Sequence, residues 1–151
     1  MFSFFRKRKF FSEAEQALIL NAIREAETRT SGEVRVFIES RCRFMDAIDR
    51  AAEVFFRLEM DETADRNAVL VYVAVQDHQM AVFGDKGIHE RVGTDFWNAE
   101  IAKMMEIFNK DNIAQGIAAC VEDIGQALHR HFPYDRDTDK NELPDDIVFG
   151  K

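Results

Sequence analysis

The sequence predicts a single α/β domain whose sheet is mixed, with two parallel strands and one antiparallel strand. An unbroken apolar run at Ala68–Val75 is typical of a central strand covered on both faces. An alternating strand pattern at Glu33–Glu39 precedes this run, and a helical pattern separates the two, as in a parallel crossover. Only a short polar turn separates the run from a third strand at Gln79–Phe83, so these two strands must form an antiparallel hairpin.

Two helical patterns flank the first strand. Ser12 and Glu15 form a capping box, which predicts a helix that begins there and extends to about Thr28. A second helical pattern extends from about Phe44 to Leu58 and supplies the crossover between the parallel strands. With helices before and between the strands, both faces of the sheet can be covered.

Two more helices are predicted after the hairpin. The segment Gly84-Asp85-Lys86-Gly87 is predicted to be a turn whose glycines permit positive φ. Asp95, or Thr94, caps the next helix, and Asn112 caps the last one, which Pro133 closes. The residues expected to be buried on these two helices are Trp97, Ile101, Met104, Met105 and Phe108, then Ile117, Val121, Ile124 and Leu128.

The formal net charge of −8 over 151 residues is unevenly distributed. We divide the chain into a basic, aromatic arm at residues 1–11, an α/β domain at residues 12–132, and an acidic, loosely held tail at residues 133–151. The arm carries +4 and the tail −3, which leaves −9 for the domain. An acidic body argues against nucleic acid as a partner and favours divalent cations or a basic protein partner.

The sequence predicts a cytoplasmic monomer. The arm lacks an apolar stretch after its charges, so it does not resemble a signal peptide, and no segment is long enough to span a bilayer. Cys42 and Cys120 lie far apart without a CxxC neighbour, which favours reduced thiols. The arm either packs its phenylalanines on the domain or makes weak contact with an anionic membrane surface.

Strand topology suggests where charged side chains meet. If the first two strands are parallel, their beginnings lie at one edge of the sheet, and the antiparallel third strand ends at that edge. Carboxylates that converge repel one another unless a cation lies between them, and calcium takes about six to eight oxygen ligands. We therefore predict a divalent-cation site, calcium favoured over magnesium, with the ligands Glu33, Asn67, Asp85, Asp95, Asp65 and Asp61. The alternative is a solvated acidic rim without a site.

Motifs for common catalytic sites are missing. The histidines lack the HxxxH and HExxH spacings of zinc sites, and the chain has no GxSxG, Walker or dinucleotide-binding motif. Cys42 is followed six positions later by Ile48, where cysteine phosphatases need an arginine. We therefore predict no catalytic residue and no organic cofactor.

Three ordered motifs, together with two shorter ones, carry a family resemblance over residues 13–132. The three are Thr30–Val36, Arg66–Ala74 and Ala81–Ile88, and the shorter ones are Asp77-His78 and Asp95-Phe96-Trp97. This set resembles the TPM domain, a family named after a thylakoid-lumen protein, a photosystem-repair protein and an acetylcholine-receptor accessory protein. The resemblance implies a Rossmann-like three-layer α/β/α sandwich, divalent-cation binding in some members, and a weak acid phosphatase activity.

The resemblance also frames the function that we expect. Many relatives are exported and membrane-anchored, whereas this chain resembles the short, cytosolic, stand-alone branch. We expect a non-enzymatic accessory or interaction module that binds a divalent cation, calcium favoured, through the carboxylates at the sheet edge. The alternatives are a weak metal-dependent acid phosphatase and a membrane-surface module that uses residues 1–11.

Overall fold

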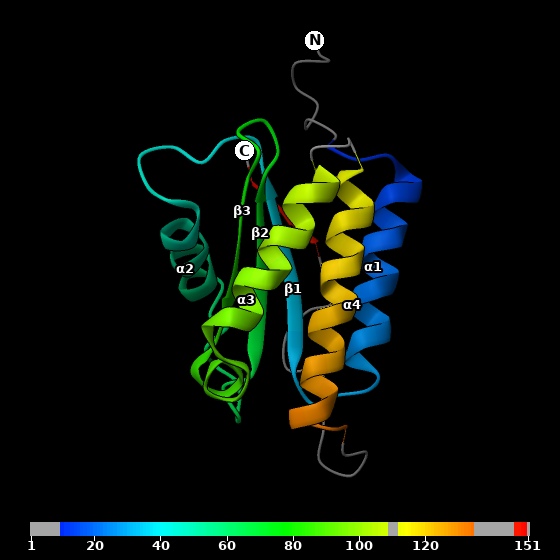
Figure 1. The fold of residues 1–151 in the computed structure, drawn as a ribbon, viewed down its shortest axis with the longest axis vertical. Helices are drawn as coiled ribbons and strands as arrows, with labels where there is room; N and C mark the ends of the chain where they lie inside the picture. Colours follow the sequence, from blue (N-terminus) through cyan, green and yellow to red (C-terminus); the bar gives the residue numbers. More distant parts are fainter. Residues whose placement is uncertain (1–9, 109–111, 135–146, 151) are drawn as a thin grey trace.

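A four-stranded sheet with helices on both faces forms the core of the computed structural model (Figure 1). The structure describes residues 10–108, 112–134 and 147–150. Within these residues the helices and strands follow one another in the order α1 (Glu13–Glu27), β1 (Glu33–Glu39), α2 (Ala47–Arg57), β2 (Ala68–Ala74), β3 (Gln79–Gly84), α3 (Lys86–Phe108), α4 (Ile113–His131) and β4 (Ile147–Phe149). None of these helices has the length and apolar composition that crossing a bilayer requires.

The strand order in the sheet is β3-β2-β1-β4. β1 and β2 are parallel, with Glu33 opposite Ala68, and β2 and β3 are antiparallel, with Val69 opposite Gly84. The predicted crossover and hairpin are therefore confirmed. Because β2 is central and covered on both faces, all seven of its residues are buried, as its unbroken apolar run predicts.

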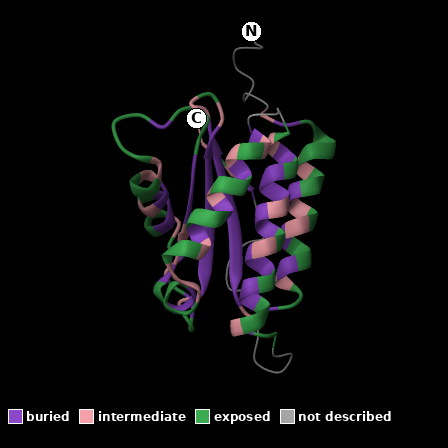
Figure 2. Ribbon diagram, in the orientation of Figure 1, coloured by how far each residue is buried: buried purple, intermediate pink, exposed green. Residues whose placement is uncertain are grey.

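Alternate residues of β2 face two separate hydrophobic clusters. Val69, Val71 and Val73 pack with residues of α1, α3 and α4. Leu70 and Tyr72 point the other way and pack with α2. Figure 2 shows the buried sheet between α2 on one side and the three other helices on the opposite side. The three-layer α/β/α sandwich is thus confirmed, with one helix on one face and three on the other.

The fourth strand differs from what the sequence predicts. We expected residues 133–151 to be loosely held, yet Ile147–Phe149 pairs in parallel with Val36–Ile38 of β1. The side chain of Ile147 is buried in the core, and the ring of Phe149 stacks on Phe10 at 6.1 Å between centroids. The strand was missed because three residues after a polar stretch give no periodic signal. Residues 135–146, like residues 1–9 of the predicted arm, lie outside the described part of the chain.

The start of α3 also differs from the prediction. The helix begins at Lys86 instead of Asp95, and Gly93 interrupts it with φ 80° and ψ 170°. The predicted cap therefore lies just after a kink that only glycine adopts readily. The Trp97 Nε1–H donates a hydrogen bond of 3.0 Å to His89 Nδ1 across this kink. Contrary to expectation, neither Gly84 nor Gly87 adopts positive φ.

The predicted helix starts are right for α1 and for α4, which begins directly after Asn112, and they are shifted for α2 and α3. The Ser12 capping box is present, with Glu15 N–H donating to Ser12 Oγ at 3.1 Å and Ser12 N–H donating to Glu15 Oε1 at 2.9 Å. α2 begins at Ala47, later than the expected Phe44. Phe44 instead adopts a left-handed φ of 72°, and its side chain is 99% exposed.

Candidate functional site

The beginnings of β1 and β2 and the end of β3 meet at one edge of the sheet. Glu33 N–H donates to Asn67 O at 3.4 Å, and Asp85 N–H donates to Ala68 O at 2.9 Å. Glu33, Asn67 and Asp85 are 3%, 1% and 3% exposed. The topology therefore brings together three of the six predicted cation ligands, and it buries all three of them.

Asp85 is paired with a basic side chain that the sequence prediction did not connect with it. Arg66 Nε and Nη2 donate to the two carboxylate oxygens at 2.6 and 2.7 Å, which makes a bidentate pair. These hydrogen bonds raise the pKa of Arg66, and the charge of Asp61 adds to the effect. The charge of Asp85 is thus compensated within the chain, although the sequence predicts Asp85 to be available as a cation ligand.

The backbone of Arg66 is fixed by the first turn of α3. Its φ of 51° lies in the left-handed region, and its carbonyl accepts a hydrogen bond of 2.8 Å from Gly87 N–H. A Cβ on Gly87 would lie 2.1 Å from Asp65 O and 2.6 Å from Arg66 O, so only glycine fits. Close backbone packing therefore places the Arg66 guanidinium against Asp85.

Asn67 supplies a buried oxygen for which the described part of the chain offers no partner. Its side-chain amide donates to Ser31 Oγ at 3.3 Å, whereas Oδ1 accepts no hydrogen bond from any described residue. A buried acceptor left without a donor is unfavourable, and amide oxygens are among the ligands that calcium takes. This atom is the feature of the edge that fits a cation.

The other predicted ligands are less favourably placed. Asp61 is half-buried, whereas Asp65 and Asp95 are exposed. Among the described residues, no three His, Cys, Asp or Glu side chains lie close enough together to hold a metal ion. The six residues thus do not form a ready-made carboxylate cage, and the cation site stays a prediction.

The opposite edge of the sheet holds a second polar cluster, which faces α2. Arg50 forms a bidentate pair with Glu39, with Nε–Oε2 and Nη2–Oε1 distances of 2.9 and 3.0 Å. The Tyr72 hydroxyl donates to the same carboxylate. Burial, followed by this hydrogen bond, raises the pKa of Tyr72. Both oxygens of Glu39 are bonded within the chain, so the cluster ties α2 to the sheet.

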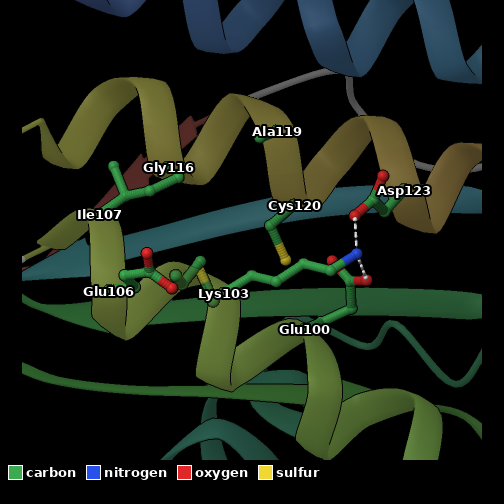
Figure 3. Close-up of a pocket in the computed structure, with 9 residues that line it drawn as sticks. Glu100, Lys103, Glu106, Ile107, Gly116, Ala119, Cys120 and Asp123 are labelled. Atoms are coloured by element: carbon green, nitrogen blue, oxygen red, sulfur yellow. Dashed lines mark hydrogen bonds and ion pairs between the residues drawn. The ribbon is translucent and has the colours of Figure 1, made fainter.

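A pocket of about 210 Å³ lies between α3 and α4 (Figure 3). Lys103 Nζ lies between two carboxylates there, 3.0 Å from Asp123 Oδ2 and 3.4 Å from Glu100 Oε2. Glu100 is 3% exposed, and its Oε1 has no hydrogen-bond partner among the described residues. Burial and the neighbouring Asp123 raise the pKa of Glu100 to about 7, although Lys103 opposes the shift. The Cys120 thiol also lines the pocket, and burial raises its pKa, so it is a poor nucleophile.

This pocket was not predicted from the sequence, although the position of Glu100 in the sequence is a signal for it. Glu100 lies three positions after Trp97 and four before Met104, so it falls on the apolar stripe of α3. A carboxylate at such a position is expected to be buried and to need a partner. Lys103 lies three positions later on the same helix and is therefore within reach of Glu100. The approach of Asp123 follows only from how α3 packs on α4.

Comparisons with known proteins agree with this architecture. The family model described as TPM domain matches residues 5–127. The solution structure of the BA42 protein from the psychrophilic bacterium Bizionia argentinensis is 41% identical, with a TM-score of 0.86 over 96% of this chain and 99% of that one. The N-terminal domain of the cg2496 protein from Corynebacterium glutamicum shares the fold, with 15% identity and a TM-score of 0.63 over 79% of this chain and 74% of that one. No curated protein matches the sequence.

Proposed function

Because this chain belongs to the TPM domain family, we propose that it is a non-enzymatic accessory domain that binds a divalent cation at the Asp85 edge of its sheet. Calcium is the favoured ion, since the available ligands are carboxylate and amide oxygens. Asp85 and Asn67 are the central ligands of the proposal, with Asp61 and Glu33 beside them and water completing the coordination. The accessory role leaves the protein partner open.

The observation that carries the proposal is the Oδ1 of Asn67, which has no partner among the described residues and lies at the same edge of the sheet as the buried Asp85. Asn67 is 1% exposed, so this oxygen has been removed from water without gaining a donor from any described residue. The residue after it, Ala68, accepts the backbone hydrogen bond of Asp85. A cation near these two residues would satisfy the amide oxygen and use the negative charge of the carboxylate.

Arg66 acts as the competing cation in this proposal. Its guanidinium takes both oxygens of Asp85, so a metal ion must displace it before it binds there. The Arg66 side chain is 37% exposed and has solvent into which it can move. We therefore expect weak calcium binding, on the order of millimolar, as in the weakest natural calcium sites.

Two variants with opposite expected effects test the proposal. Arg66→Gln removes the competitor and should tighten calcium binding, whereas Asp85→Asn removes the central carboxylate and should abolish it. Binding is measured by the change in amide NMR signals around Asn67 and by the rise in Tm on titration with calcium, with magnesium as the comparison ion. If neither the wild-type protein nor Arg66→Gln responds up to about 10 mM calcium, the proposal is wrong.

Further variants of this protein separate the proposed function from the two alternatives. A weak metal-dependent phosphatase would hydrolyse p-nitrophenyl phosphate and lose that rate in both Asp85→Ala and Glu33→Ala. A rate that survives both changes would indicate a contaminating enzyme. A membrane-surface module would bind anionic vesicles and lose this binding on deletion of residues 1–9, a change that keeps Phe10 and the buried Phe11 on the core.

A further inference from the structure

The pocket between α3 and α4 is small and its charged groups are mostly acidic. Its volume of about 210 Å³ lies below the ~300–1,000 Å³ of pockets for drug-sized ligands, so it suits a molecule of a few heavy atoms. Three carboxylates line it, those of Glu100, Glu106 and Asp123, against the single ammonium of Lys103. This balance favours a cationic ligand over an anionic one.

The buried carboxylate of Glu100 is poorly paired within this pocket. Its Oε1 has no partner among the described residues, and Oε2 has only Lys103 Nζ at 3.4 Å. Hydrogen bonds between an ammonium and a carboxylate are usually ~2.7–2.9 Å long, so this contact is weak. Lys103 lies closer to Asp123, and Figure 3 shows its ammonium between the two acidic groups. Glu100 therefore has unused capacity to accept hydrogen bonds.

The rest of the wall is apolar. The side chains of Met104 and Ile107 on α3 and of Ala119 and Cys120 on α4 line the pocket, and Gly116 leaves space beside Ile107. A hydrated metal ion would gain nothing from this wall, and a neutral apolar molecule would leave Glu100 Oε1 without a donor. A ligand that fits both parts has a charged N–H donor at one end and a short alkyl chain at the other.

We propose that this pocket binds a small primary alkylammonium. Its ammonium donates to Glu100 Oε1 and approaches Asp123, and its alkyl chain lies along Met104 and Ile107. Lys103 partly competes for the same carboxylates, and its side chain is 63% exposed, so it can move aside. This site is separate from the proposed cation site, because Glu100 and Asp123 belong to α3 and α4 and not to the sheet edge.

The first test is a titration of the full chain, labelled with ¹⁵N, with n-propylammonium chloride at constant ionic strength and about pH 8, where Glu100 is ionised. We expect saturable shifts of the amide signals of residues around Lys103 and Cys120. The uncharged control, 1-propanol, should leave these signals in place. Absence of a saturable shift, or an equal shift with 1-propanol, would overturn the proposal.

Three variants make the test specific to the pocket. Glu100→Gln keeps the size of the side chain and should weaken binding by at least about tenfold, because a charged acceptor is lost. Lys103→Met removes the competing ammonium and should tighten binding, a gain that a disrupted fold would not produce. Glu122→Gln removes an exposed acid of α4 outside the pocket and should leave binding unchanged. Equal affinity of Glu100→Gln and wild-type protein would refute the site.

Discussion

Asp85 and Glu100 are buried to the same degree but paired very differently. Each is 3% exposed. Asp85 receives two short hydrogen bonds from one guanidinium, whereas Glu100 receives one long contact from an ammonium and keeps one oxygen without a donor among the described residues. The comparison shows that burial alone does not identify a binding group. What matters is how many hydrogen bonds the carboxylate still lacks.

The two carboxylates also differ in how tightly the backbone beside them is packed. Beside Asp85, Gly87 lies so close to the Asp65–Arg66 backbone that no Cβ fits. Beside the Glu100 pocket, a Cβ on Gly116 would lie 3.3 Å from Ile107 Cγ2, a side-chain contact that can yield. The backbone beside Asp85 is therefore tightly packed and the Asp85 carboxylate is paired, whereas the pocket between the helices has space and a carboxylate oxygen without a donor among the described residues.

The two glycines give the largest expected contrast. Gly87→Ala should lower the free energy of unfolding by about 3 kcal/mol, because its Cβ meets backbone atoms that cannot move independently. Gly116→Ala should change it by less than about 1 kcal/mol, since the gain in helix propensity offsets the contact with Ile107. Urea denaturation of both variants measures the difference. Similar losses in the two variants would contradict the contrast between a tightly packed edge and an open pocket.

Amide replacement of the two carboxylates should separate them next. Asp85→Asn is expected to destabilise the fold by ~1–3 kcal/mol, because a charged bidentate pair is lost in a buried place. Glu100→Gln should stay within about 1 kcal/mol of wild-type or be slightly stabilising at about pH 8, because it removes a poorly paired buried charge. Denaturation of both variants under the same conditions measures these two changes in the free energy of unfolding. An equal loss would mean that Glu100 is as well satisfied as Asp85.

The pH dependence of stability gives the most specific effect, because it follows a single carboxyl group. The pKa of Glu100 is raised from its usual 4.5 to about 7, so between these values the folded state holds more protons than the unfolded state. Glu100 therefore contributes its full stabilisation below about pH 4.5. As pH rises towards 7 this contribution to the free energy of unfolding is lost, at no more than ~1.4 kcal/mol per pH unit.

The groups that set this pKa lie on both helices of the pocket. Besides burial, they are Asp123 of α4, which raises the pKa, and Lys103 of α3, which lowers it. The Cys120 thiol and the Glu106 side chain also line the pocket. Comparing denaturation curves of wild-type protein and Glu100→Gln from about pH 5 to pH 8 isolates the contribution of Glu100. The variant should gain in relative stability as pH rises. A constant difference across this range would show that Glu100 titrates at its ordinary pKa.

Backbone topology was predictable from the sequence to a large extent. The unbroken apolar run of β2 and the short turn before β3 are enough to bring Asp85 to the same edge as Glu33. The sequence did not reveal that Arg66 is the partner of Asp85. Arg66 lies in a loop with left-handed backbone, and loop conformation depends on tertiary contacts such as that with Gly87.

The pocket between α3 and α4 was harder to predict, for a different physical reason. The predicted stripe of α4 was correct, since all four of its residues are buried. In the stripe of α3, Trp97, Met104 and Phe108 are buried, whereas Ile101 and Met105 are half-buried. A stripe shows which face is buried but not which residue of the other helix meets it. Lys103 lies three positions after Glu100 on the same helix, but the approach of Asp123 depends on the rotation and offset of the two helices, which side-chain packing determines.

The short strand β4 has a consequence for how the molecule behaves towards other chains. Without it, β1 would present an uncovered row of peptide N–H and C=O groups, a template on which a strand of another molecule can add. β4 covers Val36–Ile38, the middle of β1. A strand of only three residues thus replaces β1 as the edge on this side of the sheet, and so short an edge offers few peptide groups to a strand of another molecule.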